Sequence, residues 1–471
     1  MYCASFSTRT ENSWYYYCMN GVRAFLLTSL IGLVALVVGS CGSAQQSIFV
    51  PDASSDGGAD AAVYYPPLGP ACVGLQCQQV QCEAGTTTVS GTVFDPAGKV
   101  PLYNAIVYVP NSPLAPLSTG ASCDRCGYVS GDPLVSTLTG PDGRFELQNV
   151  PAGAGIPLVV QIGKWRRQLS IPTVAACTET ALPAGDVRLP RNQSEGDLPQ
   201  MAIATGGADP MECLLTKMGI DTSEFTPDTG NGRVRFYKEN GYDMNPPVPA
   251  ANTLFDDGAK LAENDIVFLP CEGSPDPKTP TQTQNLITYT DMGGRVFTTH
   301  YGYVWIYGAQ DPFPSTGQWD PEQSDQYSLT LPTTINQTFP KGAAFARWLV
   351  NVNASTTLGQ LGITEGRHDL DGANDPPSTA WITTTGEPAP HTNGVLHMTF
   401  NTPIEAPEDQ KCGRVVYSDF HVSASALSGL PLFPDSCKTG DLSDQEKALE
   451  FMLFDLSSCV QSDSVPPEAP H

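Results

Sequence analysis

The stretch from Asn264 to Gly273 reads NDIVFLPCEG, and its centre, DIVFL, is a continuous apolar run typical of a strand buried on both faces. A helix is expected next, over Thr279–Met292, starting after Pro280. The Gly-led run from Gly293 to His300, GGRVFTTH, follows as a second buried strand. Strands that alternate with helices predict right-handed crossovers and a mostly parallel sheet. This part of the chain therefore predicts an α/β fold.

The α/β pattern continues on both sides of this core. After the turn Gly206–Pro210 a helix is expected, and a last helix should follow the Ser443 start signal. An insertion at residues 307–411 interrupts the pattern and should be rich in strands. The remaining expected elements are strands over Pro199–Thr205, Arg233–Tyr237, Ala346–Val352, Leu396–Phe400 and Cys412–Phe420, and helices over Met211–Met218 and Lys447–Leu456.

The chain before residue 190 has a different pattern, with short strands separated by Pro and Gly turns. Such spacing predicts an all-β sandwich. With the α/β part, it makes the chain multidomain, as its 471 residues suggest. The expected strands of this part are Thr87–Phe94, Ala105–Val109, Arg144–Leu147, Pro157–Ile162 and Arg167–Ile171.

The N-terminus has the pattern expected of an export signal. The apolar run from Ala24 to Val38 has 15 residues, too few for a membrane-spanning helix and suited to a signal peptide. It ends in Val38-Gly39-Ser40-Cys41, which resembles the lipobox of bacterial lipoproteins. The resemblance implies a leader and signal peptide over residues 1–40, a lipid on Cys41 that anchors the chain in a membrane, and an outer-membrane or cell-surface location. The alternative is an ordinary signal peptide whose cysteine is incidental. Residues 41–71, mixed in Ser, Gly, Ala, Asp and Pro, are expected to be a flexible tether.

Charge and cysteine content narrow the function. The chain has 24 Lys and Arg against 49 Asp and Glu, a net charge of −25, which argues against binding nucleic acid. Setting aside Cys3, Cys18 and Cys41 leaves eleven of the 14 cysteines. For an exported chain we expect disulfides rather than a zinc site. Because eleven is odd, at least one cysteine should stay free unless it pairs between chains, and Cys271 is the candidate.

Four segments of the N-terminal half carry a family resemblance. They are Val89–Asp95, Asn104–Val109, Thr139–Phe145 and Asn149–Gly153, and together they resemble the carboxypeptidase regulatory-like domain. The resemblance implies a transthyretin-like sandwich over residues 72–190 that acts as an accessory and carries no catalytic residues. Its one basic cluster, Lys164–Arg167, could bind an anionic glycan or phosphate; a solvated strand edge is the favoured interpretation.

A second resemblance covers the α/β part. Asn264–Gly273, Tyr289–Gly294, Arg295–His300 and Gly413–His421 resemble the class I glutamine amidotransferase-like superfamily, in particular its ThuA-like branch. This resemblance implies a flavodoxin-like domain over residues 198–460, with the insertion at about 307–411.

Compared with catalytic amidotransferases, the expected triad is not intact. The family places a nucleophilic Cys at a strand-to-helix elbow, where this chain has His300, and a His-x-Glu after a later strand, where it has His421 and Ser423. Cys271 lies at the end of the preceding strand, which in the family helps to build the oxyanion region. Open α/β sheets bind ligands beyond the carboxyl ends of their strands. The residues expected to gather there are Gly206, Gly207, Cys271, Glu272, His300, Tyr301, His421 and Ser423.

Three interpretations of this group of residues remain open. It could be a degenerate domain that binds a ligand or partner, a hydrolase, or a purely structural crevice. In the hydrolase, His300 and His421 would hold a metal or relay protons with Glu272 as a carboxylate. In the insertion, Asp369, Asp371 and Asp375 could bind calcium, but a solvated acidic loop is favoured because EF-hand spacing is absent. No cofactor is expected.

The sequence as a whole favours an exported, lipid-anchored envelope or cell-surface protein. Its role would be binding or structural, with a glycan or protein ligand and a catalytically degenerate amidotransferase-like domain. The alternative is a surface hydrolase that acts on glycan or amide substrates in a crevice at His300 and His421.

Overall fold

The computed structural model describes residues 72–241, 243–321, 330–364, 366–386, 393–422 and 432–470. The predicted signal peptide, lipid site Cys41 and tether, together with Ser423, lie outside the described residues. Among the described helices, none has the length and apolar character needed to cross a membrane.

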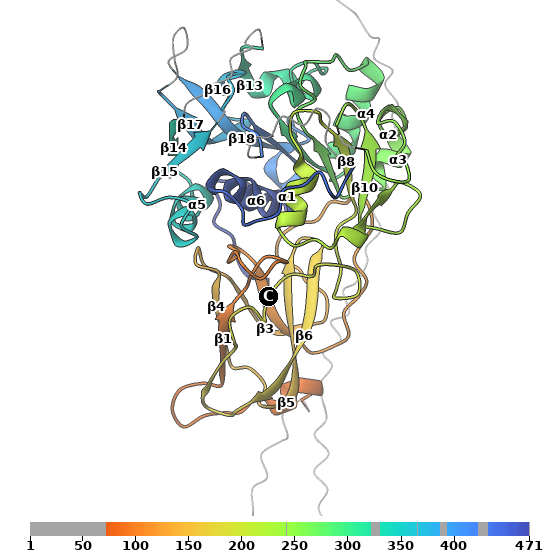
Figure 1. Ribbon diagram of the computed structural model, residues 1–471. Helices are drawn as coiled ribbons and strands as arrows, with labels where there is room; N and C mark the ends of the chain where they lie inside the picture. Colours follow the sequence, from red (N-terminus) through yellow and green to blue (C-terminus); the bar gives the residue numbers. More distant parts are fainter. Residues whose placement is uncertain are drawn as a thin grey trace, which may run out of the picture. The chain divides into compact units, whose positions relative to one another are not determined.

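Residues 72–190, the two-sheet region, are built of strands as predicted (Figure 1). One sheet has the order β4-β1-β7 and the other β3-β2-β5-β6. Val89 and Leu147 of the first sheet share a core with Val107 and Val160 of the second. The transthyretin-like topology remains a prediction. The bounds are η1 Gly74–Gln78, β1 Thr88–Thr92, β2 Ile106–Pro110, β3 Pro133–Leu138, β4 Arg144–Gln148, β5 Gly153–Ile162, β6 Trp165–Val174 and β7 Glu179–Ala181.

Residues 198–470, the α/β region, are organised around a ten-stranded sheet of order β15-β14-β17-β18-β19-β12-β11-β8-β10-β9 (Figure 1). The strands from β19 to β9 pair in parallel, as the sequence predicts, and the insertion adds the other four as antiparallel strands along one edge. The strands of the sheet are β8 Met201–Thr205, β9 Phe225–Pro227, β10 Val234–Lys238, β11 Ile266–Leu269, β12 Arg295–Thr299, β14 Thr330–Ile335, β15 Gln360–Thr364, β17 Ser378–Thr384, β18 Gly394–Thr402 and β19 Gly413–Ser418.

Helices complete the α/β region. Its α-helices are α1 Met211–Lys217, α2 Asn252–Phe255, α3 Gly258–Ala262, α4 Pro280–Asp291, α5 Pro340–Asn351 and α6 Asp444–Ser457. Shorter 3₁₀ helices are η2 Thr222–Glu224, η3 His300–Trp305, η4 Phe313–Thr316 and η5 Glu408–Gln410, and a small two-stranded sheet pairs β13 Gly317–Trp319 with β16 Leu370–Ala373.

The central strand β11 is buried on both faces, as its apolar run indicates. Ile266 and Phe268 belong to the core that also holds α1, α5 and α6 residues. Val267 and Leu269 belong to a second core, which holds α2, α3 and α4 residues. Because successive strand side chains point to opposite faces, one apolar run supplies both cores.

The prediction of a strand over Ala346–Val352 is wrong, because residues 346–351 lie in helix α5 and Val352 is its C-cap. Pro340 stands at the first helical position. Phe345, Trp348 and Leu349 have the three- and four-residue spacing of one helix face, and all three are buried. The apolar run therefore reflects one face of a helix rather than a strand.

The prediction that Lys164–Arg167 forms a solvated edge is also wrong. Trp165 is fully buried, and the Lys164 ammonium lies 2.5 Å from the Asp265 carboxylate in the α/β region. Lys164 also donates to the Gly120 carbonyl. The basic cluster therefore belongs to the contact between the two-sheet region and the α/β region, which we call the junction.

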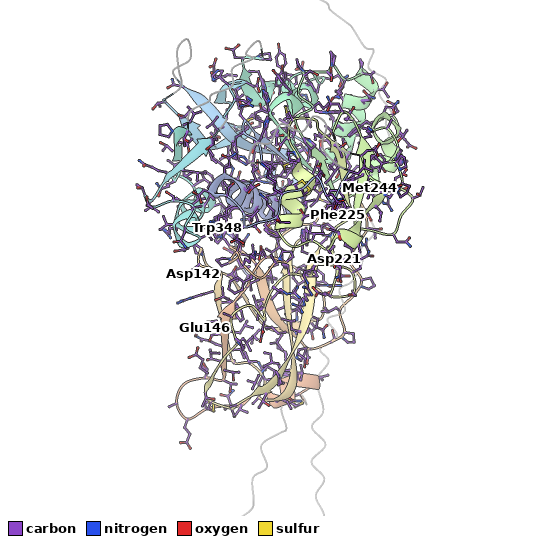
Figure 2. All side chains as sticks on the ribbon, in the orientation of Figure 1. Asp142, Glu146, Asp221, Phe225, Met244 and Trp348 are labelled. Carbon is purple, nitrogen blue, oxygen red and sulfur yellow. A yellow bond between two sulfur atoms is a disulfide. The ribbon has the colours of Figure 1, made fainter. Side chains whose placement is uncertain are left out.

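Further bonds cross the junction. Disulfides Cys123–Cys412 and Cys126–Cys459 join the two regions covalently. The Trp348 indole, labelled in Figure 2, donates to the Pro101 carbonyl at 2.7 Å. Residues of both regions also belong to one continuous hydrophobic core. The junction is therefore an extension of the core.

The cysteine prediction is confirmed within the described residues. The other disulfides are Cys72–Cys77, Cys82–Cys177 and Cys213–Cys437, and Cys271 is the free cysteine. Five disulfides indicate an oxidising compartment, outside the cell or in the periplasm.

Candidate functional site

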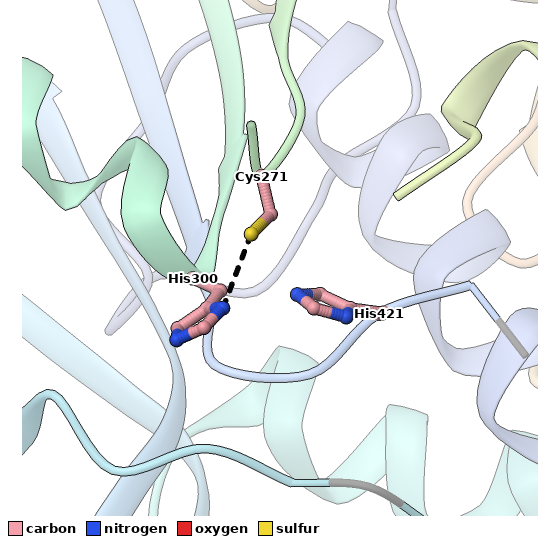
Figure 3. Close-up of side chains that lie close together, drawn as sticks. All are labelled: Cys271, His300 and His421. Carbon is pink, nitrogen blue, oxygen red and sulfur yellow. Dashed lines mark hydrogen bonds between the residues drawn. The ribbon is translucent and has the colours of Figure 1, made fainter. Parts of the chain in front are cut away.

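Three side chains meet beyond the carboxyl ends of β11, β12 and β19, and we call them the strand-end site: Cys271, His300 and His421 (Figure 3). Their possible ligand atoms all lie within 4.8 Å of one another. Cys271 Sγ is 3.1 Å from His300 Nδ1, and the two imidazole centres are 5.1 Å apart. All three residues are buried. The parallel strands bring them together because their carboxyl ends meet at one edge of the sheet.

Cys271 is fixed by its backbone. It follows β11 through Pro270, and its N–H donates to Thr299 Oγ1 at 3.0 Å. Its carbonyl lies so close to Gly206 that a Cβ there would come within 2.4 Å of the oxygen. Gly206 is therefore needed for the close approach of two strand ends.

His300 has a left-handed backbone, with φ of +41°. It directly follows β12 and is the first residue of η3, at the elbow where the family resemblance expects a nucleophile. Such a conformation costs a non-glycine residue on the order of 1–3 kcal/mol and is typical of functional sites. Tyr301 stacks on the His300 ring, with centroids 3.8 Å apart.

His421 completes the strand-end site from the segment after β19. Its imidazole points toward Cys271 and His300 (Figure 3), and Nε2 has no hydrogen-bond partner among the described residues. The His421 carbonyl accepts from the Gln445 side chain at 2.7 Å, which links this segment to α6. A buried nitrogen without a partner is rare and calls for an explanation.

Two carboxylates, those of Asp369 and Asp209, lie just outside the strand-end site. Asp369 Oδ2 lies 3.7 Å from His300 Nε2 and accepts from the Tyr417 hydroxyl at 3.1 Å. On the other side, Asp209 accepts from Thr299 Oγ1 at 2.6 Å and from the Val422 N–H at 2.9 Å. Asp209 thus ties together the ends of β12 and β19.

Burial sets the charge of the site. It raises the pKa of the Cys271 thiol to about 12 and lowers the pKa of His421 to about 3. Burial, with His421 and Arg367 nearby, also holds the pKa of His300 well below its usual value. Near neutral pH the site therefore holds a neutral thiol and two neutral imidazoles. A neutral thiol is a poor nucleophile, but neutral imidazoles can accept a proton or bind a metal.

Other predicted site residues have other contacts. The Glu272 carboxylate is 2.5 Å from the Lys278 ammonium, and burial raises its pKa to about 7. The Gly207 N–H donates to the Asn240 side chain. Among the described residues, the group of donor atoms within 4.8 Å does not contain Glu272. Tyr301 and Gly206 do reach the site, Tyr301 by stacking on His300 and Gly206 by packing against the Cys271 carbonyl.

The prediction of a solvated acidic loop is wrong for Asp369. Asp369 is fully buried, whereas Asp371 and Asp375 are exposed, so the three do not share one environment. Asp371 instead pairs with His368 at 3.1 Å. Sequence reasoning missed Asp369 and Asp209 as neighbours of the strand-end site, since neither stands in a motif that distinguishes it from other acidic turn residues.

A separate cavity of about 410 Å³ lies at the junction. Its lining includes Tyr128, Gln161, Lys164, Cys459 and Glu468. None of the three strand-end residues lines it. This cavity is therefore separate from the strand-end site.

The chain matches no family model and no curated protein. Solved structures that are similar to it include two ThuA-like proteins. One, from Parabacteroides merdae, is 12% identical with a TM-score of 0.29 and covers 57% of this chain and 93% of its own. The other, from Bacteroides uniformis, is 9% identical with a TM-score of 0.27 and covers 47% and 80%. A cytoplasmic protein from Salmonella typhimurium is 10% identical with a TM-score of 0.29 and covers 56% and 100%. TM-scores this low do not establish a common fold.

Proposed function

We propose that the chain is an exported, lipid-anchored protein of the bacterial envelope or cell surface with a binding or structural role. In this proposal the two-sheet region is a carboxypeptidase regulatory-like accessory, and the α/β region is a catalytically degenerate member of the amidotransferase-like superfamily. The disulfides support the compartment, and the lipobox-like segment ending at Cys41 supports the anchor.

One observation carries the non-catalytic part of the proposal: the elbow position is His300, and the nearby Cys271 is buried as a neutral thiol. Acyl transfer by a cysteine needs a thiolate that substrate can reach. Cys271 has no exposed surface. Without a nucleophile at the elbow, the site lacks the first requirement of amidotransferase chemistry.

A second candidate function is a surface hydrolase acting on glycan or amide substrates. It is favoured by the partner-free Nε2 of His421, which could accept a proton from an attacking water. The two candidates differ in whether His421 supports turnover.

A panel of amide, ester and glycoside substrates separates them. We expect no turnover above the buffer rate for the wild type. The control is His397→Gln, since His397 is also a buried histidine but contacts Ser418 instead of the strand-end site. Turnover that His421→Ala abolishes and His397→Gln retains would establish the hydrolase.

The anchor has its own test, labelling with radioactive palmitate in a Gram-negative host. Wild-type chain should incorporate label, and Cys41→Ala should not, because the lipobox cysteine is the acceptor. Equal labelling of both chains refutes the anchor and leaves the binding role to be judged on the substrate panel.

A further inference from the structure

We propose that Cys271, His300 and His421 form a binding site for one Zn²⁺ or Cu⁺ ion. The proposal concerns the strand-end site as a metal centre and does not depend on membrane anchoring. The sequence-based hypothesis placed Glu272 beside the two histidines. In this proposal the Cys271 sulfur takes that place, because the Glu272 carboxylate pairs with Lys278.

The distances suit a metal with one sulfur and two nitrogen ligands. Zinc binds sulfur at about 2.3 Å and imidazole nitrogen at about 2.0 Å, so tetrahedral ligands lie roughly 3.5 Å apart. Cys271 Sγ and His300 Nδ1 are 3.1 Å apart, and all three donor atoms lie within 4.8 Å. Shifts of a few tenths of an ångström to about 1 Å would bring them to bonding distance.

His421 provides a second, independent observation that favours a bound ion. Its Nε2 is buried, points into the site in Figure 3 and has no hydrogen-bond partner in the described part of the chain. A desolvated nitrogen that makes no bond costs free energy. A metal ion would use this lone pair and remove the cost.

Asp369 lies on the side of His300 where metal-binding histidines usually have a carboxylate. A ligating imidazole commonly donates its other N–H to a carboxylate, which fixes the tautomer and the ring. His300 faces Cys271 through Nδ1 and Asp369 through Nε2, at 3.7 Å. Asp369 is itself held by Tyr417. The left-handed backbone of His300 thus places a ring between a sulfur and a carboxylate.

The ligand types select the ion. Thiolate and imidazole suit Zn²⁺ and Cu⁺, whereas Mg²⁺ and Ca²⁺ require oxygen ligands that this trio does not provide. Three protein ligands leave a fourth position for water or a bound molecule. Binding converts the thiol to a thiolate: the metal–sulfur bond forms, the S–H bond breaks and the proton passes to solvent, with no change in oxidation state.

The test uses the full chain, freed of metal by a chelator and then desalted. Co²⁺ serves as the spectroscopic probe for Zn²⁺, and Cu⁺ is supplied from a coloured chelator complex without thiol reductant. We expect one metal per chain and a thiolate-to-Co²⁺ charge-transfer band that Zn²⁺ displaces. If Zn²⁺ fails to bind and Cu⁺ binds stoichiometrically, the site is a Cu⁺ site.

Variants locate the ion. Cys271→Ala should abolish the band, His421→Ala should weaken binding on the order of 100-fold or more, and Asp369→Asn should weaken it about 10–100-fold. The control is Asp371→Asn, since Asp320, His368 and Asp371 form the other described group able to hold an ion. It should bind like the wild type.

Several results would overturn the site: no stoichiometric binding of either ion, binding of Co²⁺ without the thiolate band, or binding unaffected by Cys271→Ala. Loss of metal binding in Asp371→Asn would assign the ion to the group of Asp320, His368 and Asp371. Because a variant could misfold, X-ray absorption of the metal-loaded wild type provides a second measurement. One sulfur and two imidazoles around the ion support the proposal, and a shell of oxygens alone refutes it.

Discussion

The junction and the strand-end site both bury polar side chains, but they differ in whether these side chains have partners. At the junction, the Lys164 ammonium meets the Asp265 carboxylate at 2.5 Å and a backbone carbonyl as well. At the strand-end site, His421 Nε2 has no partner among the described residues, and His300 has a strained backbone. Paired buried charge is what a structural contact needs, whereas an unpaired and strained group points to a ligand. From this comparison we expect the junction to contribute stability and the strand-end site to be where a ligand binds.

The largest expected effect comes from cutting the junction disulfides. Changing Cys123, Cys126, Cys412 and Cys459 to Ala should lower the free energy of unfolding by about 5 kcal/mol, because these bonds close loops with separations of 289 and 333 residues. The control is Cys72→Ala with Cys77→Ala, which opens a loop of separation 5 and should cost less. Denaturant unfolding measures both, and equal losses would contradict a structural junction.

The next effect is the loss of the junction ion pair. Lys164→Met leaves the buried Asp265 carboxylate without its cation and should destabilise the chain by about 3–5 kcal/mol. Adding Asp265→Asn should recover part of this loss. Lys99→Met is the control, since its pair with Asp441 is exposed and its removal should not change stability measurably. If Lys164→Met loses no more stability than Lys99→Met, the Lys164–Asp265 pair does not hold the junction together.

A smaller, pH-dependent effect concerns Glu212, in α1. Burial raises the pKa of its carboxyl to about 8, and the acid near it is Asp209, just outside the strand-end site. The folded chain keeps this proton near neutral pH, whereas the unfolded chain releases it near pH 4.5. Through this group, the wild type therefore loses stability as the pH rises from about 5 to 8.

Glu212→Gln removes that dependence. The stability of the variant relative to the wild type should rise by on the order of 2 kcal/mol between pH 5 and pH 7. Thermal unfolding at several pH values measures the difference. Parallel pH profiles for the two chains would contradict a raised pKa of Glu212 in the folded chain.

The smallest effect tests the strain at His300 directly. At φ of +41°, His300→Gly should be more stable than His300→Ala by about 1 kcal/mol, since Ala is strained in the left-handed region. His421 has no left-handed backbone, so the order should reverse there, with His421→Ala the more stable. Thermal unfolding of the four variants decides. If the Gly and Ala variants rank in the same order of stability at both positions, the backbone of His300 is not strained.

Much of the fold could be predicted from short-range patterns. The DIVFL run gave a strand that is buried on both faces, and the alternation of strands and helices gave a parallel sheet through β11, β12 and β19. One predicted strand is an exception. Ala346–Val352 is helical because Pro340 starts a helix whose apolar face covers the core. A short apolar run fits a strand or a buried helix equally well.

The strand-end site could be predicted only in part. Cys271, His300 and His421 stand at predicted strand ends, so their proximity followed from the parallel sheet. Asp369 could not be predicted, because it comes from the insertion, and no local pattern says where an insertion will fold back. Lys164 likewise looked like a surface residue, since its carboxylate partner lies 101 positions away in the chain.

The sequence by itself determined the periodicity of the strands, the position of the elbow residue His300 and the odd number of cysteines that leaves one free. These depend on neighbours along the chain or on simple counting. Only the tertiary structure decided which cysteines pair, which charges are buried at the junction, and that His300 lies between the Cys271 sulfur and the Asp369 carboxylate. The physical reason is that such contacts join residues far apart in sequence, so they form only when the whole sheet closes around them.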